Sequence, residues 1–343
     1  MGKFNPSITR IKKNNKFVYI FIKTSEPVEC EESLEFIDKL RIPPVWEDVK
    51  IDIDSSDILV TGMDKGGKKQ YIYSIDHVKK VAKIKFCKLI KMGSKIEKLK
   101  VDLAGYLESN SMTKDTLIAL IIKTIIECSF RIGTEKCFDK YESVGMTTIQ
   151  KKHLFFDKNS LKIEFIGKKG VLNTCFIFDS NPSTKNMILL YKKLIANKKE
   201  NDFIFNYENK LISHLDVNRF LEIYGNITSK DFRTWNANTF FLYNITHIDA
   251  PENKKSNPQN NSLKLIDLKL EKERKKATKD VIKMVAEKLH HTEAICKKNY
   301  LLMDMVNMYI DDINKFKKLI SKDNDYTTNF LNFLKWYCKG KSK

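Results

Sequence analysis

The chain has 343 residues, which favours two domains over one, and 42% of its residues are hydrophobic, enough to build buried cores. It carries 62 Lys and Arg against 43 Asp and Glu, a formal net charge of +19. Such a surplus excludes an acidic surface and indicates a polyanionic partner, most often nucleic acid, although runs such as KKNNK also fit a general bias toward Lys and Asn.

The seven cysteines and the apolar segments exclude several other classes. No two cysteines have the C-x-x-C spacing of a zinc or redox motif, so no metal site is expected. Their odd number, and a start without an apolar signal region, indicate an intracellular, non-secreted protein in a reducing compartment. The longest apolar stretch, residues 117–126, is interrupted by Lys123 and is too short to cross a bilayer, so we expect a buried helix there.

The first part of the chain, residues 1–81, is predicted to be a small β-rich domain. Glycines between the last two expected strands, at 62, 66 and 67, predict a hairpin turn, and Pro43-Pro44 excludes a helix. The expected strands alternate β-branched and aromatic residues with polar ones. They are Phe17–Lys23, Val49–Asp54, Asp57–Gly62 and Lys69–Ile75.

Residues 82–343 are predicted to be a larger, mainly helical domain, with helical periodicity from about Lys83. Thr113 is the expected N-cap of the apolar helix, Arg131 lies in its last turn, and Gly133 is its C-terminal glycine. Three antiparallel strands follow in a meander between residues 147 and 178. The predicted fold class is therefore α+β, with a three-stranded sheet embedded in the helical domain.

Beyond Pro182 the chain is predicted to be helical again. A helix over residues 227–243 begins with a capping-box pattern, Thr228 and Asp231. Residues 251–261 are polar and predict a loop, followed by a charged helix over 263–279 and an amphipathic one over 280–289. A last helical run, capped by Thr292, carries Tyr300.

Five side chains could carry chemistry. His291 lies nine positions before Tyr300, and Arg131 ends an apolar helix. Arg233 lies in the first turn of its helix, where backbone amides favour anions, and Lys168 lies at the tip of a β-hairpin. Each taken alone fits ordinary packing, a cap or a solvated surface charge.

Together the five fit the cleavage of a phosphodiester without a metal. Arginine can donate two hydrogen bonds at once to phosphate oxygens, and a histidine N–H adds another donor. A tyrosine phenol can act as the nucleophile and conserve the bond energy, and a lysine can protonate the leaving 5′ oxygen. No acidic cluster or nucleotide-binding P-loop motif stands out, so no metal, ATP or other cofactor is expected.

Several motifs, in order and spacing over nearly the whole chain, resemble the type IB DNA topoisomerases, specifically the compact poxvirus-type enzymes of large DNA viruses. The resemblance implies relaxation of supercoiled duplex DNA through a 3′-phosphotyrosyl intermediate at Tyr300, followed by religation. It implies phosphate-binding roles for Arg131, Arg233 and His291, rather than His290, and a general-acid role for Lys168, with Lys169 as the nearest alternative. The motifs are IPPVWEDVKI (42–51), TGMDKGGKKQYIY (61–73), FRIG (130–133), VGMTTI (144–149), FIGKKGV (165–171), KDFRTWNAN (230–238) and VAEKLHHTEAICKKNY (285–300).

The same resemblance suggests residues that read DNA. Gln70, Tyr71 and Tyr73 match family positions that touch DNA, and strand alternation predicts that the two tyrosines share a face. Gln70 could bond a purine edge in the major groove.

The helix after Arg131 departs from the family pattern. It has Thr134 and Cys137 where that pattern has a lysine and a tyrosine, while Lys136 keeps one positive charge. The target sequence therefore stays open, as does the compartment: virion, viral factory or nucleus. The expected form is a monomer that closes around duplex DNA.

Two other functions fit parts of the pattern. A tyrosine recombinase shares the catalytic set but needs contacts that join two DNA sites, and the β-rich amino-terminal domain argues against it. A non-catalytic DNA-binding protein could keep the fold, but binding alone does not require Tyr300.

Overall fold

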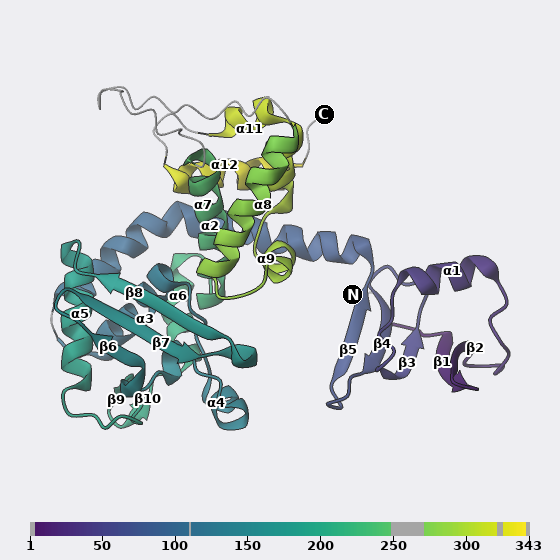
Figure 1. Ribbon diagram of the computed structural model, residues 1–343, viewed down its shortest axis with the longest axis horizontal. Coiled ribbons are helices and arrows are strands. Elements are labelled where there is room, and N and C mark those ends of the chain that lie inside the picture. The colour runs from purple at the N-terminus through teal and green to yellow at the C-terminus, as the bar shows by residue number, and fades with distance from the viewer. Residues whose placement is uncertain (1–3, 110, 248–270, 321–324, 341–343) are drawn as a thin grey trace. The chain divides into compact units, whose positions relative to one another are not determined.

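The computed structural model describes residues 4–109, 111–247, 271–320 and 325–340, and it divides into two compact units, Met1–Lys85 and Phe86–Lys343 (Figure 1). The boundary lies inside helix α2 (Ile75–Glu108), whereas residue 81 is the boundary expected from sequence. The predicted loop over 251–261 and the start of the predicted helix over 263–279 lie outside the described residues.

The first unit is an antiparallel five-stranded sheet in the order β2-β1-β3-β4-β5, with helix α1 (Glu31–Lys39). Ile37 of α1 is buried in the same core as Ile8 and Val60. The predicted β-rich character is confirmed, but β1 and α1 are additions to the prediction. The strands are β1 (Ile8–Lys13), β2 (Lys16–Phe21), β3 (Glu47–Ile51), β4 (Ile58–Met63) and β5 (Lys69–Tyr73).

A buried arginine explains why β1 escapes a search for hydrophobic alternation. Arg10 is only 9% exposed, and its guanidinium donates to the carbonyls of Ile42 (3.3 Å), Pro43 (3.0 Å) and Trp46 (2.6 Å). Its guanidinium carbon also lies 4.2 Å from the ring centroid of Phe17. Arg10 thus donates to three carbonyls of the proline-containing connection, of which the Pro43 carbonyl also accepts from the Trp46 N–H at 3.1 Å.

The second unit is built around α7 (Ser229–His247), which contacts α3, α6, α8 and α12. This central place explains why most side chains of α7, including polar ones, are buried. Half of the expected capping box is present, because the Asp231 carboxylate accepts from the Thr228 N–H at 2.7 Å, whereas the Thr228 hydroxyl donates to the same carboxylate at 2.9 Å instead of accepting from the Asp231 N–H. The other helices are α3 (Lys114–Cys128), α4 (Glu135–Tyr141), α5 (Pro182–Ile195), α6 (His214–Leu221), α8 (Glu271–Lys288), α9 (Glu293–Asn299), α10 (Met303–Asp311), α11 (Ile313–Leu319) and α12 (Tyr326–Lys339).

The predicted three-stranded meander is also confirmed, as β6 (Leu154–Phe156), β7 (Ser160–Ile166) and β8 (Leu172–Phe178). Helices α3 and α5 contact β8 (Figure 1). The first strand is shorter than expected, because residues around it form two 3-10 turns, Met146–Thr148 and Lys151–His153. With this sheet in a mainly helical unit, the predicted α+β fold class is confirmed. A short hairpin, β9 (Asn206–Tyr207) and β10 (Lys210–Leu211), completes the strands.

Several predicted helix ends are wrong. Thr113 caps α3 as expected, but the helix ends at Cys128 with Ser129 in the left-handed region (φ 55°). Arg131 therefore lies beyond the helix rather than in its last turn, and Gly133 is not its C-terminal glycine. Helix α2 begins at Ile75 rather than near Lys83, directly after β5.

Helix α8 runs unbroken over Glu271–Lys288, so a break expected near residue 280 is absent from this described stretch. Among the residues that the structure describes, none of the helices has the length and apolar character needed to cross a membrane.

Two disulfides lie in the second unit, Cys87–Cys338 and Cys128–Cys175. The sequence spacing did not indicate them, because the partners are 251 and 47 positions apart. A reducing compartment, as expected from the sequence, would open both bonds. The second bond ties the end of α3 to β8.

Candidate active site

The centre of the site is the guanidinium of Arg233, which is 2% exposed. Its two terminal nitrogens donate to the backbone carbonyls of Ser129 and of Leu289, the latter at 2.7 Å, and its Nε lies 3.4 Å from the hydroxyl of Tyr300. Arg233 is the fifth residue of α7, so it begins the second turn, not the first as predicted. Within the described part of the chain no carboxylate pairs with it, so its charge is oriented but not neutralised.

Tyr300 is held against two of the other predicted site residues. It directly follows α9 and is 6% exposed. Its ring stacks on the ring of His291, with centroids 4.8 Å apart and planes 10° apart, and the Arg233 guanidinium lies 5.2 Å from its centroid. Burial alone would raise the pKa of Tyr300, but the charge of Arg233, its hydrogen bond and the charge of Arg131 outweigh burial and lower that pKa below its ordinary value. The phenolate form of Tyr300 is thereby stabilised.

Asn238 is a part of the site that the sequence did not reveal. It is fully buried on α7, and its amide nitrogen donates to the Tyr300 carbonyl at 2.9 Å and to the Thr234 carbonyl at 2.7 Å. Its amide oxygen accepts from the Leu302 N–H at 2.8 Å. One helix therefore holds both the hydroxyl of Tyr300, through Arg233, and the backbone at and just after Tyr300, through Asn238. An asparagine inside a helix could have hinted at such a bond.

His291 lies between α8 and α9, where Thr292 caps α9 as predicted by accepting from the Ile295 N–H. Burial, followed by the charge of Arg233, lowers the pKa of His291 to about 4. The ring is therefore neutral at ordinary pH and can still donate one N–H. Its Nε2 is buried and, among the described residues, has no hydrogen-bond partner. Nδ1 lies 3.3 Å from the Thr292 carbonyl. In the other neutral tautomer, which carries the proton on Nε2, that N–H can donate to a phosphate oxygen.

Arg131 is placed by a close backbone contact. Its carbonyl accepts from the Met146 N–H at 3.0 Å, and Gly133 packs on Gly145 so closely that a Cβ on Gly145 would lie 2.5 Å from the Gly133 Cα. Gly133 also has φ +79°, a conformation that favours glycine. The Arg131 side chain is half-buried, and its charge lowers the pKa of both Tyr300 and His291. The structure thus brings together Arg131, Arg233, His291 and Tyr300.

Lys168 stands apart from these four residues. It is exposed in the 3-10 turn Lys168–Gly170 that joins β7 to β8, and Lys169 beside it is exposed with φ +64°. In the part of the chain that is described, no hydrogen bond or ion pair joins Lys168 to the other four. Its position at the hairpin tip agrees with the prediction, and its role stays a prediction.

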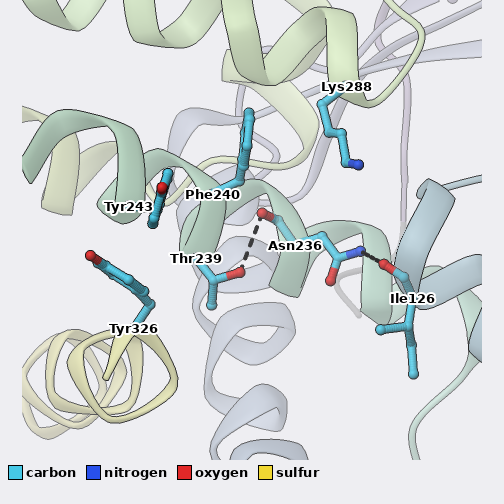
Figure 2. Close-up of a pocket in the computed structure, with 7 residues that line it drawn as sticks. All are labelled: Ile126, Asn236, Thr239, Phe240, Tyr243, Lys288 and Tyr326. Atoms are coloured by element: carbon cyan, nitrogen blue, oxygen red, sulfur yellow. Dashed lines mark hydrogen bonds between the residues drawn. The ribbon is translucent and has the colours of Figure 1, made fainter. Parts of the chain in front are cut away.

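A small pocket of about 260 Å³ lies between the end of α3 and α7 (Figure 2). Asn236 points toward the end of α3 there, and its amide donates to the Ile126 carbonyl at 2.7 Å and to the Ser129 hydroxyl at 3.0 Å. This bond fixes the segment whose carbonyl orients Arg233. The pocket is lined by Ile126, Asn236, Thr239, Phe240, Tyr243, Lys288 and Tyr326.

The predicted DNA-reading residues lie on exposed surfaces. Tyr71 and Tyr73 of β5 are 42% and 40% exposed, share a face as predicted, and have ring centroids 5.9 Å apart. His77 stacks on Tyr73 at 4.8 Å, and Gln70 donates to the Asp64 carboxylate at 2.6 Å. In the second unit, Lys136 is exposed on α4.

The chain was then compared with known proteins. Residues 76–326, about three quarters of the chain, match the family described as eukaryotic DNA topoisomerase I, catalytic core. DNA topoisomerase 1B of Acanthamoeba polyphaga mimivirus is 28% identical, covering 97% of this chain and 95% of that protein. DNA topoisomerase 1 of Rabbit fibroma virus (strain Kasza) is 26% identical, covering 88% and 93%, and DNA topoisomerase 1B of Vaccinia virus (strain Copenhagen) is 25% identical, covering 81% and 78%.

Among solved structures, the XerH site-specific recombinase bound to palindromic difH substrate aligns with a TM-score of 0.36 at 12% identity. The alignment covers 65% of this chain and 50% of that one, so the chain spans half the length of that recombinase.

The family match identifies the class of protein as an isomerase that acts through a topoisomerase I catalytic core. The chain belongs to the DNA topoisomerase I family, and the resemblance to viral type IB enzymes is confirmed.

Proposed function

We propose that the chain relaxes supercoiled duplex DNA by transient cleavage of one strand, with Tyr300 as the nucleophile. The observation that carries the proposal is the contact between the Tyr300 hydroxyl and Arg233, within a site that also holds His291 and the charge of Arg131. A buried, un-neutralised guanidinium beside a phenol favours the phenolate, and it can then stabilise charge on a phosphate bound at the same place.

The proposed reaction has two balanced steps. The Tyr300 oxygen, having lost its proton to solvent, attacks the phosphorus and forms a 3′-phosphotyrosyl ester, while the bond from phosphorus to the 5′ oxygen breaks. Lys168 gives its proton to that oxygen, so the strand leaves as a 5′-hydroxyl. After the free strand has turned about the intact one, the 5′-hydroxyl attacks the ester, returns its proton to Lys168 and releases Tyr300. Because the ester keeps the bond energy, neither ATP nor a metal is required.

The remaining residues of the site bind the phosphate. Arg131, Arg233 and His291 donate to its non-bridging oxygens, where charge develops in the transition state. On the exposed strand β5, Gln70 and the stacked pair Tyr71 and Tyr73 contact the duplex; Lys136 on α4 adds a cation. The enzyme acts as a monomer, and its net charge of +19 makes DNA binding weaken steeply with salt.

The decisive experiment uses an end-labelled, nicked suicide duplex that traps the covalent intermediate, followed by denaturing electrophoresis. The wild-type chain should give a protein–DNA adduct without a metal ion, and Tyr300→Phe should reduce adduct formation by at least about 10⁴-fold. Tyr243→Phe is the matched control, because Tyr243 is 46% exposed on α7 and should leave the adduct unchanged. Equal adduct from Tyr300→Phe would end the proposal, and recombinant products from two duplexes would favour a recombinase.

A further inference from the structure

His290, the neighbour of His291, occupies a backbone position that normally favours glycine. After α8 the His290 N–H bonds to the Glu287 carbonyl at 3.0 Å, and the His291 N–H bonds to the Ala286 carbonyl at 3.1 Å. This pair of bonds is the Schellman pattern of a helix end, and His290 is its left-handed residue, with φ +53°. A side chain with a Cβ there costs about 1–2 kcal/mol of strain, so the contacts of the imidazole are of interest.

The His290 ring bridges from the end of α8 to the end of α3. It lies 5.4 Å from the ring of Phe130, and a hydrogen bond to the Cys128 backbone favours its protonated form, which makes the ring the donor and the carbonyl the acceptor. Its Nε2 is buried and has no hydrogen-bond partner among the described residues, so Nδ1 is the atom that bonds to Cys128. The ring thus joins two segments that are remote in sequence.

Those two segments are the ones that orient Arg233. One guanidinium nitrogen donates to the carbonyl of Ser129, next to Cys128, and the other donates to the carbonyl of Leu289, next to His290. Each carbonyl lies at a chain turn that contains a residue in the left-handed region. Ser129 itself has φ +55°, and His290, which follows Leu289, has φ +53°. The distance between the Ser129 and Leu289 carbonyl oxygens therefore sets the plane in which the Arg233 guanidinium lies.

We infer that His290 is a positioning residue, which fixes the Ser129 and Leu289 carbonyls relative to each other and so aims Arg233 at Tyr300 and the scissile phosphate. The inference rests on the proposed function, since it assigns His290 a part in the chemistry of that site. It also accounts for a buried imidazole beside a guanidinium: burial, followed by the charge of Arg233, lowers the pKa of His290 to about 4, so the ring adds no second positive charge at ordinary pH.

The test compares three substitutions by their single-turnover cleavage rates at saturating DNA. His290→Gly relieves the backbone strain but removes the ring, and we expect cleavage to slow by about 10- to 100-fold with unchanged DNA affinity, because a misaimed catalytic group loses rate rather than binding. His290→Asn tolerates the left-handed conformation and places an amide N–H where Nδ1 lies, so it should restore the rate to within about threefold of wild type. His290→Gln places its amide where Nε2 lies and should not restore the rate.

The outcomes separate this inference from the proposed function. If wild-type protein forms no adduct on the suicide duplex, the proposed function itself is wrong. If wild type forms the adduct and His290→Gly cleaves equally fast, only the positioning role is overturned. Rescue by Gln rather than Asn would also overturn it, because Nε2 would then be the working atom and His290 would contact the phosphate directly. Thermal unfolding of each variant shows that it is folded before its rate is compared.

Discussion

Arg10 in the first unit and Arg233 in the second are both buried, and both donate to backbone carbonyls rather than to a carboxylate. Arg10 donates to three carbonyls of one connection and also bonds to the side chain of Tyr19 in the same sheet, so its donors serve the fold. Arg233 gives its terminal nitrogens to two remote segments and keeps Nε toward the hydroxyl of Tyr300. The same burial and the same kind of acceptor thus serve stability in one unit and chemistry in the other.

Burial of an arginine does not by itself reveal its role. The role depends on the group that faces the N–H not bonded to a backbone carbonyl. Burial lowers the pKa of both arginines. Arg233 in turn lowers the pKa of Tyr300.

The largest effect is expected from Arg233→Ala. Loss of the guanidinium removes charge stabilisation from Tyr300 and from the bound phosphate, and single-turnover cleavage should fall by about 10³-fold. Arg219→Ala, an exposed arginine on α6, is the matched control and should cleave at nearly the wild-type rate. The comparison fails if Arg233→Ala lowers the unfolding temperature but leaves cleavage intact.

The next effect is expected from Asn238→Leu, which removes the bonds to the Tyr300 carbonyl and to the Leu302 N–H. Displacement of the nucleophile should slow cleavage by about 100-fold at saturating DNA. Asn244→Leu is a close control, because Asn244 lies on the same helix and its amide donates only to the Phe240 carbonyl within that helix. Similar losses in the two variants would show that α7 is merely destabilised.

A smaller effect is expected in the titration of Tyr300. In the wild type its pKa is lowered, so the phenolate forms below the ordinary tyrosine range; in Arg233→Ala burial still raises the pKa while the opposing charge and hydrogen bond of Arg233 are gone. The titration midpoint should therefore move to higher pH in the variant. It can be followed by the ¹³C resonance of labelled tyrosine, assigned by comparison with Tyr300→Phe. An unchanged midpoint would contradict the proposed role of Arg233.

The smallest effect on cleavage is expected from Arg10→Ala. Three buried or half-buried hydrogen bonds are lost, although the Pro43 carbonyl keeps the Trp46 N–H as a donor. Chemical denaturation should therefore show the first unit destabilised by about 3 kcal/mol, whereas Lys12→Ala on the same strand should change it by less than about 0.5 kcal/mol. Cleavage at saturating DNA should stay within about threefold of wild type. A variant that folds but forms no adduct would give Arg10 a catalytic role and erase the contrast with Arg233.

Much of the fold follows from the sequence where a pattern is repeated. Alternation predicts the meander of β6, β7 and β8, and Thr113 and Thr292 predict the starts of two helices. The prediction of helices and strands fails where a single residue adopts a burial or a backbone conformation that is unusual for its type. Arg10 occupies a core position of β1, and Ser129 ends α3 in a conformation that more often belongs to glycine.

Some parts of the candidate site can be predicted from the sequence, and others cannot. Arg131, Arg233, His291 and Tyr300 are recognisable from their motifs, and the structure brings these four together. The carbonyls of Ser129 and Leu289 have no signature in sequence, because every residue has a carbonyl and only the folded chain aims it. Asn238 is equally hidden, since its partners are backbone atoms more than 60 positions away.

The contact between Gly133 and Gly145 makes FRIG and VGMTT a single recognition unit rather than two motifs. A methyl group at either glycine would collide with the opposite main chain. Neither segment can therefore change its backbone position while the other keeps its own. An engineer who transplants the Arg131 segment into another scaffold has to carry the second segment along with it.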